Sequence, residues 1–279
     1  MTTPDRLTAH QMATLTGRSY RRLLMYLEEN HCEEYLLGPH GLRSYRVESL
    51  PEDLRAEIAR ALNEPAATIP AVPCKVFPIF PEQYAQTAAA LGRAFINDPG
   101  MWAVLPDVNE PAERAKQIAQ IFSVAMAINR RLGHPTFGIV EKDTVVAAAV
   151  IEGPSAPSTS ETMLTGLREA PRMLSAVGLG AMRRTLQLAD TLHRNRPKAP
   201  HIYLNLLGVD PGYQRRHFGI ALLDHLRDLA AERSSVAGVY LETSTEANVA
   251  YYTRAGYEML GEIFPLGVRM WRMMQPRRK

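Results

Sequence analysis

Residues 202–223 read IYLNLLGVDPGYQRRHFGIALL, and this stretch decides the fold. Residues 202–209 form an almost unbroken apolar run of strand length, which is typical of a strand covered on both faces. The DPG triplet at 210–212 then ends that strand. Apolar residues return every three or four positions from Phe218 onward, so an amphipathic helix is expected to begin close to His217. The stretch therefore predicts a strand, a tight turn and a helix.

The turn in this unit is suited to a phosphate or pyrophosphate group. Free backbone N–H groups and the positive end of the helix dipole converge there. Arg215 and Arg216 add positive charge at the same place. A basic turn before a helix is a weak motif alone, because many such turns bind nothing. The order of the residues carries more information.

The order Val-x-Pro-x-x-Gln-x-x-His-x-Gly, from Val209 to Gly219, resembles the Gln/Arg-x-x-Gly-x-Gly/Ala segment of the GNAT N-acetyltransferases. The resemblance implies that this loop holds the pyrophosphate of acetyl-coenzyme A. It implies cofactor contacts from Leu207, Val209, Gln214, Arg215, Arg216, His217, Phe218, Gly219 and Ile220. One position departs, because the first glycine of the pattern is His217 here. Glycine permits close backbone approach, so the His217 side chain must point away from the phosphates, or the site binds cofactor poorly or in altered fashion.

A second match lies downstream, where residues 239–243 form a strand-like run and residues 246–257 read EANVAYYTRAGY. This short helix closing on a glycine resembles the family's Asn-x-x-x-Tyr-x-x-x-Gly-Phe element. The resemblance implies that Asn248 helps to hold the pantetheine arm and that Tyr252 protonates the departing thiolate. A phenol within hydrogen-bond reach can give a proton to sulfur. Tyrosines are more often core aromatics, but two matched segments in the right order favour the catalytic role for Tyr252.

Further matches are similar to the GNAT enzymes related to puromycin N-acetyltransferase: LGRAF at 91–95, DP at 98–99, LPD at 105–107, HIYL at 201–204 and LETS at 241–244. The resemblance covers roughly residue 75 to the C-terminus. It implies an α/β (α+β) fold, a mixed sheet flanked by helices, with acetyl-coenzyme A as cofactor. It implies the acceptor less firmly.

Bulk properties exclude several classes. The 279 residues are 46% hydrophobic and 22% charged, as in a soluble globular protein. No apolar run reaches the roughly 18 residues of a membrane span, and no basic-then-apolar signal segment is present, so cytoplasmic residence is expected. Cys32, Cys74 and the eight histidines form no disulfide framework or ligand-spaced cluster, so no metal is expected. The net charge of +3 says little about partners.

Residues 1–64 predict a small winged helix-turn-helix domain. Residues 8–15 form a short helical stretch, and Ser19 can cap a second helix that runs through Asn30. Residues 34–47 alternate loosely around a central GPHG, which fits a hairpin. A third helix opens at the SLPE of residues 49–52 and runs to residue 62. Helix, turn, helix, hairpin and helix is the winged-helix order.

Residues 45–51, YRVESLP, resemble the wing-to-helix passage of the Mu-type transposase and repressor DNA-binding domains. The resemblance implies base or backbone contacts to DNA from Arg18, Arg21, Arg22, Arg43 and Arg46. Against it stands the charge: residues 1–64 hold eight arginines, no lysine and ten acidic residues, a net charge of −2. A DNA binder usually shows a basic footprint. A small protein-interaction or dimerisation domain is the alternative, and a winged helix that reads a palindrome would favour a homodimer.

Residues 65–74 are a proline-rich linker, after which residues 75–279 form the acetyltransferase domain. Within that domain we expect helices over 81–97 and 111–132 and a hairpin of 136–140 with 144–151. Residues 163–194 are helical and rich in Leu and Met, broken at Pro171 and loosened by Gly178 and Gly180. Core packing is their ordinary role. Because the family places a substrate-side insertion here, part of this segment is also a candidate acceptor-pocket wall.

The general base stays open at this stage. Some relatives use a glutamate six residues before the valine that corresponds to Val209, and Tyr203 occupies that position here. Glu242, Glu152 and Asp98 are candidates, a water relay is equally suitable, and Glu242 can instead be a structural hydrogen-bonding residue.

The predicted function is an acetyl-coenzyme A-dependent N-acetyltransferase with a small-molecule or amino-group acceptor. The alternatives are a DNA-binding transcriptional regulator whose GNAT domain senses acetyl-coenzyme A, and an enzyme that its N-terminal domain delivers to DNA.

Overall fold

The structure, a computed structural model, describes residues 6–8, 12, 16, 20–32, 34–37, 42–63, 74–154 and 159–277. The chain divides into two compact units, Met1–Ile69 and Pro70–Lys279. Each unit has its own buried core and is described by itself.

In its described residues, the first unit combines a three-stranded antiparallel sheet with the helices α2 and α3. Its elements are β1 (Arg6–Thr8), α2 (Tyr20–Glu29), β2 (Glu34–Leu37), β3 (Leu42–Arg46), a 3₁₀ turn (Val47–Ser49) and α3 (Glu52–Asn63), with strand order β1-β3-β2. The core holds Leu23 and Leu27 of α2 together with Leu54 and Ile58 of α3. These residues lie four positions apart and so share one face of each helix. The bounds of α2, the β2–β3 hairpin and α3 confirm the helices and hairpin expected after residue 19.

The expected first helix is wrong at its start. Thr8 lies in β1, which pairs with β3 in the register Arg6↔Arg46 and Thr8↔Ser44. Leu7 between them is buried in the core, so long-range pairing outweighs the local helical pattern. Of the remaining expected helix, Met12 is helical and the other positions lie outside the described residues.

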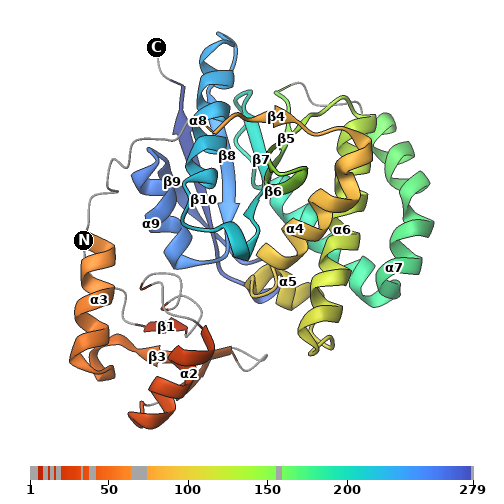
Figure 1. Ribbon diagram of the computed structural model, residues 1–279. Helices are drawn as coiled ribbons and strands as arrows, with labels where there is room; N and C mark the ends of the chain where they lie inside the picture. Colours follow the sequence, from red (N-terminus) through yellow and green to blue (C-terminus); the bar gives the residue numbers. More distant parts are fainter. Residues whose placement is uncertain are drawn as a thin grey trace. The chain divides into compact units, whose positions relative to one another are not determined.

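The second unit is built on a seven-stranded mixed sheet, coloured from orange to blue in Figure 1. Its order is β4 (Phe77–Pro78), β5 (Thr136–Glu141), β6 (Thr144–Glu152), β7 (Ile202–Val209), β8 (Gly238–Thr243), β10 (Met270–Pro276) and β9 (Glu258–Ile263). Only the β7–β8 pair is parallel among these strands. The expected mixed sheet is therefore confirmed.

Helices cover both faces of this sheet. The elements are α4 (Tyr84–Ala94), α5 (Pro99–Val104), α6 (Pro111–Arg131), α7 (Thr159–Arg194), α8 (Phe218–Ala231) and α9 (Glu246–Arg254), with 3₁₀ turns at Pro81–Gln83, Pro211–Tyr213 and Pro265–Gly267. Helices α4 to α7 lie to one side of the sheet in Figure 1, and α8 lies to the other. Alternate residues of β6 point to opposite faces of the sheet. Ala148 and Val150 belong to the core on the side of α4 to α7, whereas Ala147 and Ala149 belong to the core on the side of α8.

Helix α7 differs from its prediction at the point where it breaks. It continues through Pro171 and kinks at Gly178, whose φ of 76° and ψ of 170° are not helical. Positive φ is accessible to glycine at little cost, so the kink falls at the glycine rather than at the proline. No helix in the described ranges is long and apolar enough to cross a membrane.

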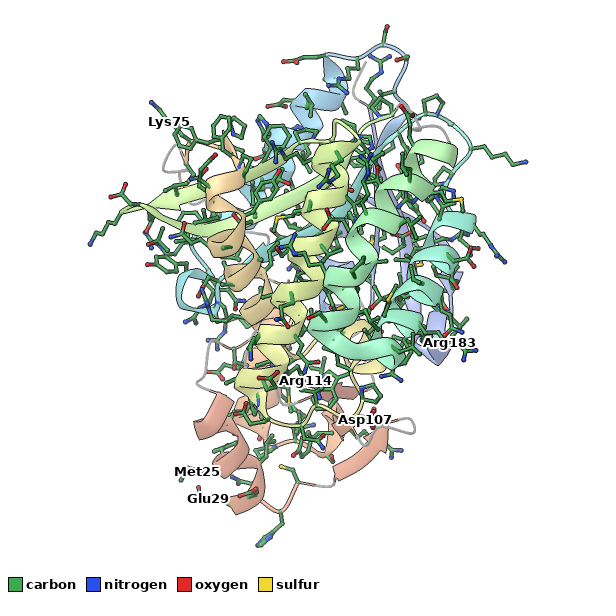
Figure 2. The ribbon with its side chains drawn as sticks, turned by 90° about the vertical axis from the view of Figure 1, so that its right-hand side faces the viewer. Met25, Glu29, Lys75, Asp107, Arg114 and Arg183 are labelled. Atoms are coloured by element: carbon green, nitrogen blue, oxygen red, sulfur yellow. The ribbon has the colours of Figure 1, made fainter. Side chains whose placement is uncertain are left out.

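A buried arginine fixes the loop between α5 and α6. Arg114 is 1% exposed, donates a hydrogen bond to the carbonyl of Val108, and lies 3.3 Å from the centroid of the Trp102 ring. Figure 2 shows Arg114 beside the loop that carries Asp107. Because cation–π contacts strengthen when they are desolvated, this stack holds α5 against α6.

Candidate active site

The parallel strands β7 and β8 separate soon after they meet. They pair at Ile202↔Val239 and Tyr203↔Tyr240, and no further pair joins the described strands. Strand β7 continues for six more residues, to Val209. This part of its β8-facing edge can therefore hydrogen-bond an extended ligand, as an added strand would.

A bulge in β7 lies at the start of this opening. Val150 of β6 faces Leu206 and Ile151 faces Leu204, so Asn205 is the extra residue. The Asn205 side chain donates from Nδ2 to Glu152 Oε1 at 3.4 Å. The bulge therefore directs a polar side chain into the space beside the separated strands.

The turn after β7 is held by side chains at its start. Asp210 accepts a hydrogen bond from the Gly212 N–H at 3.1 Å and another from Arg93 Nε at 2.8 Å. Gln214 donates from Nε2 to the Val209 carbonyl at 3.3 Å. After this turn α8 begins at Phe218, close to His217 as expected. The first amides of α8 have no intrahelical acceptor and point toward the turn.

His217, which stands where the GNAT pattern has its first glycine, has a left-handed backbone. Its φ of 62° and ψ of 10° are left-handed, and Arg215 has a φ of 63°. Left-handed conformation costs a non-glycine residue about 1 kcal/mol, although histidine tolerates it better than most residues. The His217 side chain is exposed. The substitution therefore strains the backbone without burying an imidazole in the loop.

Gly219 allows a close approach between α8 and α9. A Cβ at this position would lie 2.5 Å from the Tyr251 hydroxyl, a separation that real Cβ atoms do not show. Phe218 is buried in the core, so only its backbone can serve a ligand. Ile220 is half-buried. The turn thus offers backbone amides rather than side chains.

The basic residues of the turn are exposed, as is Gln214. Arg216 donates to both carboxylate oxygens of Glu141 at the end of β5, at 2.8 and 2.6 Å. Exposed ion pairs of this kind contribute roughly 0–1 kcal/mol. Arg216 can therefore exchange Glu141 for a phosphate at little cost.

A cavity of about 250 Å³ lies where β7 and β8 separate. Side chains from α5, α6, α7, β7, β8 and α9 line it, so residues far apart in sequence meet there. Leu207 of β7 and Asn248 of α9 are among them. Val209 lies two residues beyond Leu207 and is also partly exposed.

Tyr252 lines the same cavity and is 8% exposed. Burial raises the pKa of its phenol, and the charge of the neighbouring Asp98 raises it further. The hydroxyl therefore holds its proton at neutral pH and can act as a donor. Helix α9 supplies both Tyr252 and Asn248, which lie four residues apart and so share one face.

Glu242 carries the most distinctive electrostatics of the cavity. Burial raises the pKa of its carboxyl from 4.5 to about 7, although hydrogen bonds from Tyr240 and Tyr203 act in the opposite direction. The Tyr240 hydroxyl donates to Glu242 Oε1 at 2.8 Å. A carboxyl with a pKa near the working pH is suited to general-base catalysis.

Arg196 and Glu152 form an ion pair in the same cavity. Arg196 donates from Nη1 to Glu152 Oε2 at 2.5 Å and from Nη2 to Oε1 at 3.2 Å. Its guanidinium lies 3.6 Å from the centroid of the Tyr203 ring. Both partners line the cavity, and each neutralises the other.

Asp98 is engaged in holding the structure together. It caps α5 by accepting from the Met101 N–H at 2.9 Å, and it accepts from Ser244 Oγ at 2.5 Å. Burial raises the pKa of Asp98. Both oxygens are thus occupied, which leaves Glu242 as the base candidate with a carboxyl suited to the task.

The residues expected to contact DNA belong to the first unit. Arg21 and Arg22 lie in α2, Arg43 lies in β3, and Arg46 ends β3 with an exposed side chain. Arg18 lies outside the described residues. Within the described ranges no group of three or more His, Cys, Asp or Glu side chains is arranged to hold a metal ion.

Comparison with known proteins defines the class. Residues 110–257 match the model of the Acetyltransferase (GNAT) family, which is more than half of the chain. The chain belongs to this family. It is therefore an N-acetyltransferase that uses acetyl-coenzyme A as donor and acetylates amine acceptors.

Two solved structures are similar to this chain, and the first of them supports the fold. A histone acetyltransferase and related acetyltransferase from Corynebacterium glutamicum is 21% identical, with a TM-score of 0.51, over 74% of this chain and 97% of that one. A polyamine N-acetyltransferase from Drosophila melanogaster is 16% identical, with a TM-score of 0.46, over 72% of this chain and 97% of that one.

Proposed function

We propose that the enzyme acetylates an amine held in the cavity at the opening between β7 and β8, with Tyr252 as general acid and Glu242 as general base. One observation carries the proposal: both side chains line the same cavity, from adjacent elements β8 and α9. The similarities at residues 91–95 and 241–244 support a place in the puromycin N-acetyltransferase-related branch.

The site fits acetyl-coenzyme A, which supplies an activated acetyl thioester when bound. The amides at the start of α8 and the two left-handed residues Arg215 and His217 make a concave anion site. The free edge of β7 at Leu207 and Val209 suits the amides of the pantetheine arm, and Asn248 faces it from α9.

Glu242 would remove the proton of the acceptor. Amines are mostly protonated at neutral pH, so an acceptor needs a base before its nitrogen can attack. Tyr240 donates to Glu242 Oε1 at 2.8 Å, and Tyr203 also hydrogen-bonds this carboxyl. A carboxylate has about four acceptor positions, so Glu242 can still accept a proton. Tyr252 would then donate its phenolic proton to the leaving sulfur.

The test of the acid is Tyr252→Phe, with Tyr257→Phe as its matched control. Tyr257 is a buried neighbour outside the cavity lining, and its hydroxyl has no hydrogen-bond partner. We expect Tyr252→Phe to lower kcat about 100-fold or more, while the calorimetric Kd for acetyl-coenzyme A stays unchanged. Equal kcat values for the two variants would refute the role of Tyr252.

A second function is supported by the first unit. Its α2, the β2–β3 hairpin and α3 follow in winged-helix order, and Arg46 is exposed at the end of the hairpin. We propose that this unit is a winged helix that binds duplex DNA as a homodimer, as a regulator or as a means of delivering the enzyme.

Fluorescence anisotropy with labelled duplex DNA at two salt concentrations tests the DNA proposal. Combined replacement of Arg18, Arg21 and Arg22 by Ala should weaken salt-dependent binding at least tenfold. The control replaces Arg55 and Arg60 of α3, which the proposal leaves away from DNA. Equal losses in both variants, or no binding by the full chain, would contradict the proposal, and light scattering reports the oligomeric state.

A further inference from the structure

The lining of the cavity restricts the chemistry of the acceptor. We infer that the acceptor is a small monoamine whose single ammonium group is attached to an aromatic or branched apolar body without a carboxylate. This inference rests on the proposed function, because it places the amine beside Glu242.

Much of the cavity wall is apolar, although Thr185 and Asn205 also line it. The apolar part comes from α6, α7, β10 and the residue after α4, and it includes Phe95, Ile121, Phe122, Leu188, Leu192 and Met270. Phe95 and Phe122 meet edge to face with ring centroids 5.0 Å apart. Aromatic rings in this arrangement favour an apolar or aromatic ligand body. A polyhydroxylated sugar would leave its hydroxyls without partners against such walls.

The charges of the lining argue against an amino acid. Arg196 is the one lysine or arginine among the residues that line the cavity. Its Nη1 and Nη2 atoms donate to Glu152, whose carboxylate balances its charge, while its buried Nε has no hydrogen-bond partner. The carboxylate of an amino acid would therefore meet a cation that is already neutralised, and burial of a further negative charge is costly.

The same lining argues against a diamine. Of its three carboxyls, Glu152 is paired with Arg196, and Asp98 accepts from Met101 N–H and Ser244 Oγ. Glu242 accepts from the hydroxyls of Tyr240 and Tyr203 and has no hydrogen bond to a basic side chain, so its carboxyl is the one suited to an ammonium group. A second ammonium would face the apolar walls.

The size of the cavity indicates a small acceptor. Its volume of about 250 Å³ lies below the roughly 300–1,000 Å³ of sites for drug-sized ligands.

The first experiment compares three acceptors on the full chain with saturating acetyl-coenzyme A. They are 2-phenylethylamine, phenylalanine, which adds only a carboxylate, and 1,4-diaminobutane, which replaces the apolar end by a second amine. Release of the coenzyme thiol gives kcat/KM, and calorimetry on the protein loaded with coenzyme A gives the acceptor Kd. We expect 2-phenylethylamine to exceed each of the others at least 100-fold in kcat/KM and at least tenfold in affinity.

Two variants test whether this cavity holds the apolar body. Leu188→Trp fills it, because Leu188 lines the cavity and is 7% exposed. Leu186→Trp is the control, because Leu186 lies on the same helix and is 59% exposed. Only the first should raise the KM for 2-phenylethylamine at least tenfold. Ala125→Leu, a smaller filling change from α6, gives the same test if the tryptophan prevents folding.

The outcomes separate the inference from the function on which it rests. Preference for phenylalanine or the diamine, or no binding of 2-phenylethylamine, would overturn the inference while transfer to another amine upheld the function. Selective binding of 2-phenylethylamine without transfer would uphold the inference and overturn the proposed catalysis. Equal effects of Leu188→Trp, Ala125→Leu and Leu186→Trp would also overturn the inference.

Discussion

Replacing Glu242 by Gln should stabilise the protein at high pH and inactivate it. Burial raises the pKa of Glu242 from 4.5 to about 7, and a pKa difference of one is worth about 1.36 kcal/mol. Charging this carboxyl in the folded protein therefore costs roughly 3 kcal/mol more than in the unfolded chain. Glutamine keeps a similar shape and does not ionise, so the variant avoids that cost.

The sign of the effect follows from proton binding. Below pH 4.5 both states hold the proton, and the wild type loses nothing. Between 4.5 and about 7 the unfolded chain releases the proton while folded Glu242 retains it, so wild-type stability falls as the pH rises. Above about 7 the loss is constant. The free-energy gap in favour of the variant should therefore widen by roughly 2–3 kcal/mol between pH 5 and pH 8.

Denaturant unfolding followed by tryptophan fluorescence measures this gap in the correct unit. Both tryptophans, Trp102 and Trp271, belong to the unit Pro70–Lys279. Glu258→Gln changes an exposed carboxyl on β9 and serves as the control, with no widening expected. If the unfolding free energies of Glu242→Gln and wild type differ by the same amount at every pH from 5 to 8, the argument from burial is refuted.

The kinetic half of the prediction concerns the same proton. The groups that face Glu242 are Tyr240, Tyr203, Arg196 and Glu152. With one amine acceptor, deprotonation of Glu242 should raise wild-type kcat/KM as the pH rises to about 7, and this contribution should level off above about 7. The Glu242→Gln variant should lack that limb and fall about 100-fold or more at neutral pH. An unchanged profile would assign the base to water.

Three further predictions each concern a single substitution. His217→Gly relieves a left-handed histidine, so it should raise stability by about 1 kcal/mol and keep or tighten the calorimetric Kd for acetyl-coenzyme A; weaker binding would show that the imidazole helps to hold the cofactor. Gly219→Ala brings a Cβ within 2.5 Å of the Tyr251 hydroxyl and should weaken that Kd at least tenfold, with partial rescue by Tyr251→Phe, which removes the clashing oxygen; no rescue would refute the contact. Tyr257→Phe deletes a buried hydroxyl without a partner and should raise the unfolding free energy by about 1 kcal/mol; a loss of stability in the same fluorescence assay would point to a hidden partner.

The local part of this structure was accessible to sequence reasoning. The run at 202–209 is β7, the turn follows at Pro211–Tyr213, and α8 begins next to His217. Hydrophobic period and turn chemistry act within a few residues, so one sequence suffices to place such elements. The resemblance to the GNAT pattern, rather than hydrophobic period, marked His217 as a glycine position, and its left-handed backbone is one that glycine adopts at little cost.

Only part of the cavity could be predicted from the sequence. Tyr240 and Glu242 alternate on one strand and so share a face, a signal that could have paired them. The ion pair of Arg196 with Glu152 joins positions 44 residues apart, and no spacing rule reports such a contact. The break of α7 at Gly178 rather than Pro171 depends on the positive φ of this glycine, and the sequence offered proline and glycine as breakers without ranking them.

Two energetic costs of this fold belong to the elements of its parallel strand pair. His217 is strained in the turn between β7 and α8, and Glu242 on β8 is buried with a pKa near 7. The remaining neighbours in the sheet are antiparallel ladders, several of them paired along most of their length. Strained backbone and buried ionisable groups persist only where the surrounding structure stabilises them. The paired strands on both sides of β7 and β8 therefore provide the stability that allows the opening between them to hold a reactive site.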